Sequence, residues 1–181
     1  MKKLISLIIC LAMLLGCVCA LAETAEKQEL GTVNVNGAFK LQCAVPEGFL
    51  LCIVSQDSTR VSATLTTDDP TKPSVLVTVA FNEQYADIGR LNDVDEETLE
   101  IIRSSFSDVD EVTIEEKETS YGTKLLVVTE NPEDGIAFAD IYTIYKGYEI
   151  EFVLLPGTAG ITEENIQMMV DFASNMDFVE V

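Results

Sequence analysis

Histidine is absent from this 181-residue sequence, and basic residues are scarce: 11 lysines and arginines stand against 31 aspartates and glutamates. Without histidine, the chain cannot use Ser-His-Asp or Cys-His catalysis or the usual histidine-rich metal sites. Its formal net charge of −20 repels nucleic acid and anionic lipid, so we expect neither as a partner. The GxGxxG, P-loop and GxSxG patterns are also missing, which leaves nucleotide binding and α/β-hydrolase chemistry without support. We therefore predict no catalytic, cofactor-binding or metal-ligating residue.

The N-terminus has the pattern of an export signal. Lys2 and Lys3 precede an uncharged apolar run over residues 4–15. That run is too short for a transmembrane helix, which needs roughly 20 residues, but it suits the core of a secretory signal. We predict a signal peptide over residues 1–22 and a secreted or otherwise extracytoplasmic location.

Two processing sites compete at the end of this signal. Ala20 and Ala22 form the A-x-A arrangement that a signal peptidase requires, and cleavage between Ala22 and Glu23 would release the chain. The alternative is a lipobox ending at Cys17, which would give a lipid-anchored lipoprotein. A bulky leucine precedes the lipobox glycine, and the apolar stretch after Cys17 would make a poor tether in water. We therefore favour release, with anchoring at Cys17 as the alternative.

The remaining chain divides into a short leader and one domain. Residues 23–36 are predicted to be a flexible N-terminal segment, because this polar start is typical of domain ends. No linker, long repeat or second apolar span interrupts residues 37–181, which we assign to a single domain. We expect no membrane span once the signal is removed.

Short β-type runs, separated by turn residues, dominate this domain. Four of them precede the first predicted helix and four follow it, and residues 125–128 are apolar on both faces, which predicts a strand inside the sheet. The predicted strands lie at residues 39–43, 49–54, 61–65, 75–81, from 112, 123–130, 136–145 and 148–155. The fold class is therefore α+β: a mostly antiparallel sheet of about seven to eight strands packed by two main helices.

The two helices carry clear N-terminal signals. Asp95 is a good N-cap for a helix from Glu96 to Phe106, and Thr162 is one for a helix from Glu163 to Met176. Both apolar faces should pack on one antiparallel sheet. The predicted buried positions are Leu99, Ile102 and Phe106 in the first helix, and Ile166, Met169, Val170, Ala173 and Met176 in the second.

A two-residue turn at Lys146-Gly147 predicts a hairpin between residues 136–145 and 148–155. Its register places Ile141 opposite Phe152, and Thr143 opposite Ile150.

Only two cysteines, Cys43 and Cys52, remain after signal removal. If Glu47-Gly48 is the tip of a first hairpin, Cys43 faces Cys52 at a separation that a disulfide can span. Export places both thiols where disulfides persist, so we predict this bond. The alternative is two buried free thiols, which a one-residue shift of the turn would favour.

Three other features have ordinary structural explanations that we prefer to functional ones. Asn92-Asp93-Val94-Asp95 could gather oxygens for calcium, but it lacks the EF-hand glycine and glutamate, and a helix start explains it better. With so many carboxylates in the chain, pairs of them carry little information. The tyrosines could form a contact surface, but cross-strand packing is the simpler explanation; they are Tyr85, Tyr121, Tyr142, Tyr145 and Tyr148.

Three segments carry a resemblance to a known group of proteins. These are the stretch Phe39-x-Leu-x-Cys-x-Val-Pro-Glu-Gly-Phe49, the hairpin Tyr142-Thr-Ile-Tyr-Lys-Gly-Tyr148 with Ile150-Glu-Phe152, and the helix start Ile161-Thr-Glu-Glu164. Over residues 37–181 the chain resembles the PsbP/DcrB-like small exported proteins. The resemblance implies an antiparallel sheet sandwiched by helices and an accessory role at the envelope, and it carries over no catalytic residue.

The leading hypothesis is a secreted or cell-envelope, non-enzymatic binding or accessory domain. Its partner would be an envelope protein, a peptide or a glycan. The alternative is a carboxylate-dependent extracellular hydrolase of the glycosidase type, which needs two carboxylates roughly 5 to 9 Å apart across a cleft.

Overall fold

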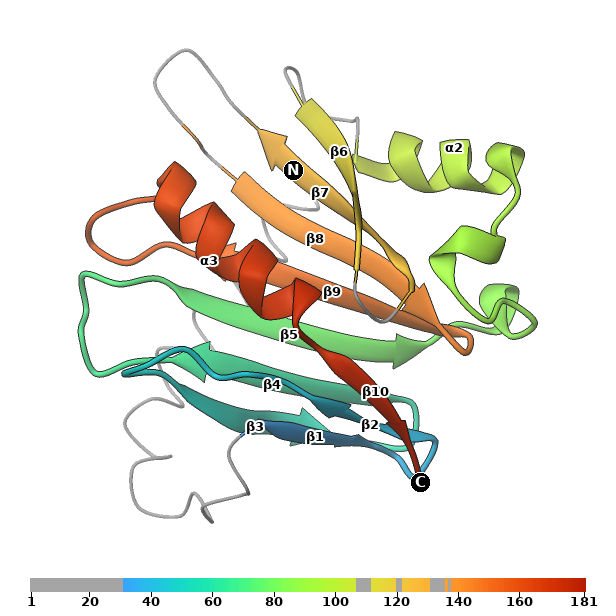
Figure 1. Ribbon diagram of the computed structural model, residues 1–181, viewed down its shortest axis with the longest axis horizontal. Helices are drawn as coiled ribbons and strands as arrows, with labels where there is room; N and C mark the ends of the chain where they lie inside the picture. The colour runs from blue at the N-terminus through green and yellow to red at the C-terminus, as the bar shows by residue number, and fades with distance from the viewer. Residues whose placement is uncertain (1–30, 107–111, 120–121, 131–135, 137) are drawn as a thin grey trace.

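The computed structural model describes residues 31–106, 112–119, 122–130, 136 and 138–181, and it shows an α+β fold (Figure 1). Seven antiparallel strands form the larger sheet, in the order β3-β4-β5-β9-β8-β7-β6, and three form a smaller one, in the order β1-β2-β10. The larger sheet contains β3 (Leu50–Gln56), β4 (Arg60–Thr66), β5 (Ser74–Phe81), β6 (Val112–Glu118), β7 (Lys124–Glu130), β8 (Phe138–Tyr145) and β9 (Tyr148–Leu155). The smaller sheet contains β1 (Thr32–Val35), β2 (Phe39–Gln42) and β10 (Asp177–Glu180). The helices are α2 (Glu96–Phe106) and α3 (Glu163–Ser174), with 3-10 turns η2 (Glu83–Tyr85) and η3 (Leu91–Asp93).

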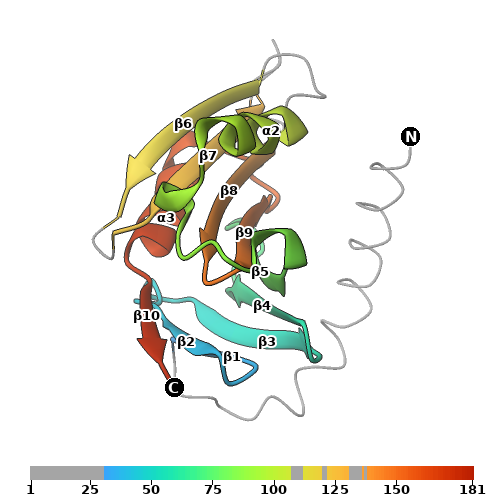
Figure 2. The ribbon, with the colours of Figure 1, turned by 90° about the vertical axis from the view of Figure 1, so that its right-hand side faces the viewer.

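One face of the larger sheet carries the main core. Alternate residues of β4, β5, β7, β8 and β9 point toward α3 and the smaller sheet, as the two-residue period of a strand requires. Figure 2 shows β1, β2 and β10 together at the end of the sheet that carries β3 and β4. Phe39 of β2 is fully buried in this core, where its ring meets those of Tyr145, Tyr148 and Phe178 edge-on.

Among the described residues, the opposite face of the larger sheet is only partly covered. Leu99 and Ile102 of α2 pack with Leu91 over Leu126 and Ile144, which covers the β7–β8 half of this face. Arg103 of α2 is ion-paired with Glu116 of β6 and holds the helix near that edge. Over β4, β5 and β9 this face carries a mixture of polar and apolar side chains, among them Thr78 and Glu151, and the site described below lies there.

Both helices begin as their capping residues predict. The Oδ1 atom of Asp95 accepts a hydrogen bond from the backbone N–H of Thr98 at 2.7 Å, and Thr162 Oγ1 accepts one from the N–H of Asn165 at 3.3 Å. These bonds satisfy N–H groups that a helix leaves unpaired. The helices pack on opposite faces of the same sheet. Phe172 is a buried residue of α3 that the predicted face did not include.

The late part of the chain folds as predicted. Strands β8 and β9 form a hairpin at Lys146-Gly147, and its register pairs Ile141 with Phe152 and Thr143 with Ile150. Both turn residues have positive φ angles, 50° and 77°, as a two-residue hairpin turn requires. Strand β7 lies between β6 and β8, and its residues 125–128 are all buried, so the prediction of an interior strand is confirmed.

Two predictions about the early part of the chain are wrong. Strands β2 and β3 do not pair: β2 lies between β1 and β10, whereas β3 pairs with β4 in the other sheet. Residues 32–35, which we predict to lie in a flexible segment, form β1, in which Val33 and Val35 are buried. The larger sheet has seven strands, within the predicted seven to eight, but the sequence pattern did not indicate the separate smaller sheet that the described residues form.

The geometric argument for a Cys43–Cys52 disulfide fails with the first hairpin, and both residues are free cysteines in the structure. Cys43 Sγ donates a hydrogen bond to the carbonyl oxygen of Gly31 at 3.2 Å. Cys52 stands on β3, where it pairs with Thr64.

We expect two reactive thiols when the chain that begins at Glu23 is unfolded without reductant and titrated with a thiol reagent. In the folded protein at pH 8, Cys43 should react slowly, because burial raises the pKa of its thiol to about 11 and the thiolate is the reacting form. A Cys43→Ser variant, which should give one thiol, is the control. Finding no reactive thiol would show that the segment between β2 and β3 rearranges to form the disulfide.

Candidate functional site

The uncovered part of the larger sheet holds a hollow of about 540 Å³. We call it the carboxylate basin, because Asp140 of β8 and Glu149 and Glu151 of β9 line it together with Tyr142. Its remaining lining includes Arg60, Thr78, Phe106 and Phe138. The basin draws its residues from four neighbouring strands and from the C-terminal end of α2.

Strand alternation explains why these side chains meet. In β8 and β9, the residues of one parity enter the main core, so Asp140, Tyr142, Glu149 and Glu151 must face the other way. The ladder pairs Tyr142 with Glu151, which places Asp140 diagonal to Glu151 on the same face. Three carboxyl groups and a phenol are thereby held on rigid strands.

Asp140 is the unusual member of the basin. Its side chain is only 1% exposed, and its Oδ1 atom has no hydrogen-bond partner among the described residues. Burial raises the pKa of Asp140 well above its usual value, and the charge of Glu151 and a hydrogen bond with Glu151 act in the same direction. The backbone N–H of Ile141 opposes the shift. Asp140 thus favours its protonated form, and its Oδ1 atom remains free to accept a hydrogen bond.

The phenols are also held in place. Tyr142 Oη donates a hydrogen bond to Glu149 Oε1 at 2.9 Å, and a second hydrogen bond joins Tyr142 to Tyr85. Burial, followed by the charge of Glu149, raises the pKa of Tyr142, so this phenol stays neutral at physiological pH. The ring of Phe106 meets that of Tyr142 edge-on at 5.8 Å, which forms an aromatic wall on the α2 side.

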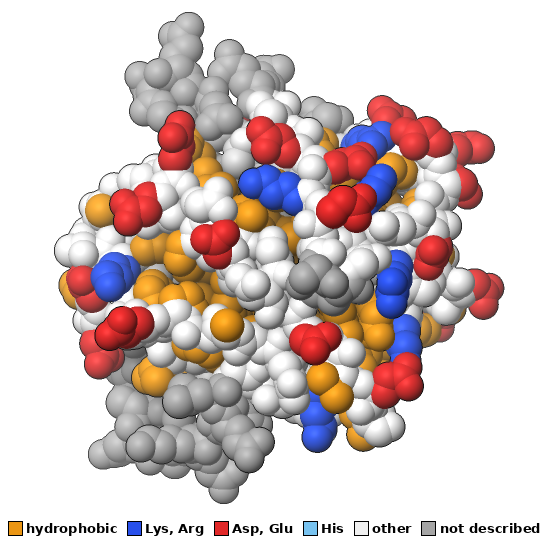
Figure 3. Space-filling view, in the orientation of Figure 1, with side chains coloured by type: hydrophobic (Ala, Val, Ile, Leu, Met, Phe, Trp, Pro, Cys, Tyr) orange, Lys and Arg blue, Asp and Glu red, His pale blue; other side chains and the backbone are white. Residues whose placement is uncertain are grey.

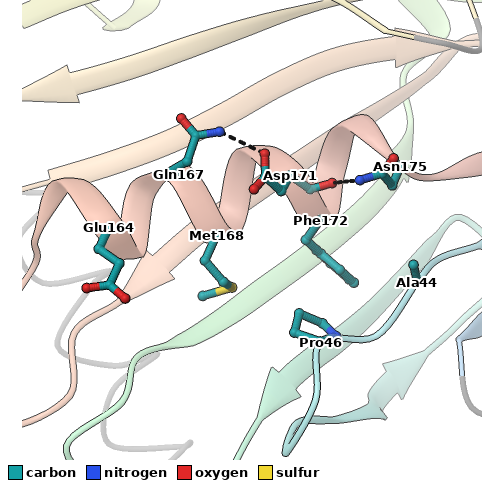
Figure 4. Close-up of a pocket in the computed structure, with 8 residues that line it drawn as sticks. All are labelled: Ala44, Pro46, Glu164, Gln167, Met168, Asp171, Phe172 and Asn175. Atoms are coloured by element: carbon teal, nitrogen blue, oxygen red, sulfur yellow. Dashed lines mark hydrogen bonds between the residues drawn. The ribbon is translucent and has the colours of Figure 1, made fainter.

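A second hollow, of about 440 Å³, lies beside α3 (Figure 4). Met168 and Phe172 point from the helix toward Pro46 and Ala44, and Figure 3 shows apolar side chains gathered there with acidic side chains around them. The polar groups at this hollow are satisfied locally, because Gln167 Nε2 and Asn175 Nδ2 bond to Asp171, at 2.7 and 2.8 Å. It offers no buried, unpaired polar group among the described residues, so the carboxylate basin is the stronger candidate.

The residues singled out from the sequence lie elsewhere or have structural roles. Ala22 and Glu23 fall outside the described residues, as do Cys17 and Tyr121. Tyr148 packs on Phe81, its partner on the neighbouring strand, as cross-strand packing predicts, and Tyr145 and Tyr148 also pack on Phe39 of the smaller sheet. Near the suspected calcium loop, Asn92 Oδ1 accepts a hydrogen bond from the N–H of Lys124. Within the described ranges, no group of three or more cysteine, aspartate or glutamate side chains is placed to hold a metal ion.

The basin was missed in the sequence because acidic residues are so common. The signal was nevertheless present: the hairpin register at Lys146-Gly147 puts Asp140, Tyr142, Glu149 and Glu151 on one face. Asp140 is an acid in the middle of a strand whose neighbours Ala139 and Ile141 are core residues, and a charge in such a strand is informative.

The helices in the described ranges are too short or too polar to cross a lipid bilayer. Comparison with known proteins finds no matching family model and no curated protein with a significant match.

Proposed function

We propose that this chain is a non-enzymatic binding domain that works outside the cytoplasm, secreted or at the cell envelope, and that the carboxylate basin holds its ligand. The buried, unpartnered oxygen of Asp140 carries this proposal. Buried polar atoms in proteins are nearly always paired, and leaving one unpaired costs about 1–3 kcal/mol. A basin of this size falls within the usual range of ligand pockets, so a bound ligand group can supply the missing partner.

The test is a binding screen by NMR on the isotope-labelled chain that begins at Glu23, with cationic, neutral and anionic small molecules. Binders should shift resonances of β8 and β9 around the basin, and Asp140→Asn should weaken their binding. Asp68→Asn is the matched control, because it removes the same charge from an exposed loop. The assignment would be contradicted by ligands that shift only resonances around the hollow beside α3, or by ligands whose affinity is unchanged in Asp140→Asn.

One observation favours the alternative of a carboxylate-dependent hydrolase: the raised pKa of Asp140 suits a general acid. Another opposes it. Asp140 and Glu151 are diagonal neighbours on one face of the sheet, whereas a glycosidase holds its two carboxylates on either side of the bond that it cleaves. If the protein releases sugars from a panel of glycans and Asp140→Asn abolishes this release, the hydrolase would be the preferred function.

We also propose that the fold belongs with the PsbP/DcrB-like group. Two features support it: a helix lies on each face of an antiparallel sheet, and the late hairpin and closing helix occupy the positions that the resemblance implies. We expect an experimental structure of a PsbP/DcrB-like protein to show a three-stranded sheet equivalent to the one formed by β1, β2 and β10.

Export leads to a prediction about the N-terminus. Intact-mass measurement of the chain recovered from outside the cytoplasm should place the first residue at Glu23, because the A-x-A site ends at Ala22. An Ala22→Arg variant should block this cleavage, whereas Cys17→Ser should leave it unchanged. A mature form that starts at Cys17 with added acyl mass would establish anchoring instead.

A further inference from the structure

The carboxyl pair of the free basin favours a bound proton. Asp140 and Glu151 are diagonal neighbours on one face of the β8–β9 ladder, and burial, together with the charge of Glu151, favours the protonated form of Asp140. Next to that proton lies the unpartnered Oδ1 of Asp140. A positively charged donor that displaced the proton would therefore meet oxygens on both residues.

The walls of the basin suit a cation that carries an apolar stem. Three carboxyl groups line it, against a single basic residue, Arg60. The rings of Phe106, Phe138 and Tyr142 stand around these groups. Carboxylates attract the charge, and aromatic rings favour both a cation and its methylene stem.

Three other ligand classes fit less well. Calcium takes six to eight oxygens, and the described residues offer no cluster of three metal-ligating side chains. An anion would meet the carboxyl groups of Asp140, Glu149 and Glu151. A neutral polar ligand would leave the charge of the carboxyl pair uncompensated.

Resting on the proposed function, we propose that the basin binds a primary ammonium group on an apolar stem, and that the ammonium replaces the proton bound by the pair of Asp140 and Glu151. The same chemistry is found in a free aliphatic amine and in a lysine side chain of a polypeptide. Because Asp140 is 1% exposed, the partly buried Glu151 must turn aside as the ammonium enters.

The exchange balances in charge. The carboxyl pair with its one proton and an ammonium become two carboxylates, an ammonium and a proton that passes to the solvent. The proton competes with the ligand, so affinity should rise with pH. The other ionisable groups facing the pair are Tyr142 from β8, Glu149 from β9, Arg60 from β4 and Tyr85 from η2. Burial raises the pKa values of both phenols, so neither of them supplies a proton between pH 5 and pH 8.

The experiment measures binding of pentylammonium and of Nα-acetyl-lysine methylamide, which represent the two sources, by calorimetry in two buffers of different ionisation enthalpy. Pentanol, pentanoate and calcium chloride are the neutral, anionic and metal probes. We expect one ammonium probe or both to bind with release of up to one proton, and more tightly at pH 8 than at pH 5. Asp140→Asn should weaken binding about tenfold or more and abolish the proton release. Glu151→Gln should do the same, and Asp68→Asn should change affinity less than twofold.

The outcomes separate the two proposals. Tighter binding of the lysine derivative than of pentylammonium would point to a polypeptide source, and the reverse order to a free amine. Pentanol, pentanoate or calcium binding in the basin with dependence on Asp140, while both ammonium probes fail, would overturn the ammonium inference and keep the basin as a ligand site. No Asp140-dependent binding of any probe, here or in the NMR screen, would overturn both.

Discussion

Replacing Phe39 with alanine should lower the free energy of unfolding by about 3–5 kcal/mol, the usual cost of removing a fully buried phenylalanine ring. Phe39 belongs to the smaller sheet, yet its ring lies 5.1 Å from that of Tyr145 and 5.3 Å from that of Tyr148 in the larger sheet. It also meets Phe178 of β10 at 5.8 Å. One side chain thus joins both sheets and the last strand, so its loss opens a cavity where they meet.

Urea denaturation followed by fluorescence or circular dichroism would measure this loss. Phe81→Ala is the matched control: the Phe81 ring also contacts Tyr148, at 5.3 Å, but the residue is 40% exposed. We expect the control to cost about 1 kcal/mol. Similar losses for the two variants would mean that the smaller sheet contributes little to the stability of the domain.

The sequence was a good guide wherever the structure is local. The β8–β9 hairpin depends on a turn at Lys146-Gly147 whose residues adopt positive φ, and that turn fixes the register of both strands. The caps at Asp95 and Thr162 act within three residues of themselves. A short window of sequence contains all the interactions that decide these features.

Non-local pairing explains the failures. The turn predicted near Glu47-Gly48 does form, because the N–H of Phe49 bonds to the carbonyl of Pro46 at 3.1 Å and Gly48 has a φ of 81°. It does not create a hairpin, because β2 pairs instead with β10, more than 130 residues away in the chain. A turn signal shows that the chain bends, but the choice of partner strand depends on which apolar faces can share a core.

The carboxylate basin depends on both local and non-local interactions. Its carboxyl groups could be placed on one face from the hairpin register alone. How far the described residues leave this face open could not be predicted, because it depends on where α2 packs: the helix covers β7 and β8, and its residue Phe106 lies beside the basin. Which part of a polar sheet face stays uncovered is a property of tertiary packing.

Replacing Asp140 with asparagine should stabilise the folded protein, and by more at pH 8 than at pH 4. Burial raises the pKa of this carboxyl above the value of about 3.9 that it has in an unfolded chain. Between these two pKa values the native state holds a proton that the unfolded state has released, so this group makes stability fall as pH rises from about 4 through the folded pKa. Asparagine has no charge to desolvate and does not titrate.

We expect the two proteins to be nearly equal in stability at pH 4 and the variant to gain about 1–3 kcal/mol at pH 8, the usual cost of a buried polar group without a partner. Urea unfolding at both pH values measures the gain, and the remaining acidic residues cancel in the difference between wild type and variant. Asp68→Asn is the control, and its exposed loop predicts no pH-dependent gain. If the difference in unfolding free energy between wild type and Asp140→Asn does not change with pH, Asp140 neither gains nor loses a proton on folding. The same substitution should weaken ammonium binding. A gain in stability with a loss of affinity is the pattern expected of a ligand site, whereas replacing a purely structural carboxyl group would destabilise the protein.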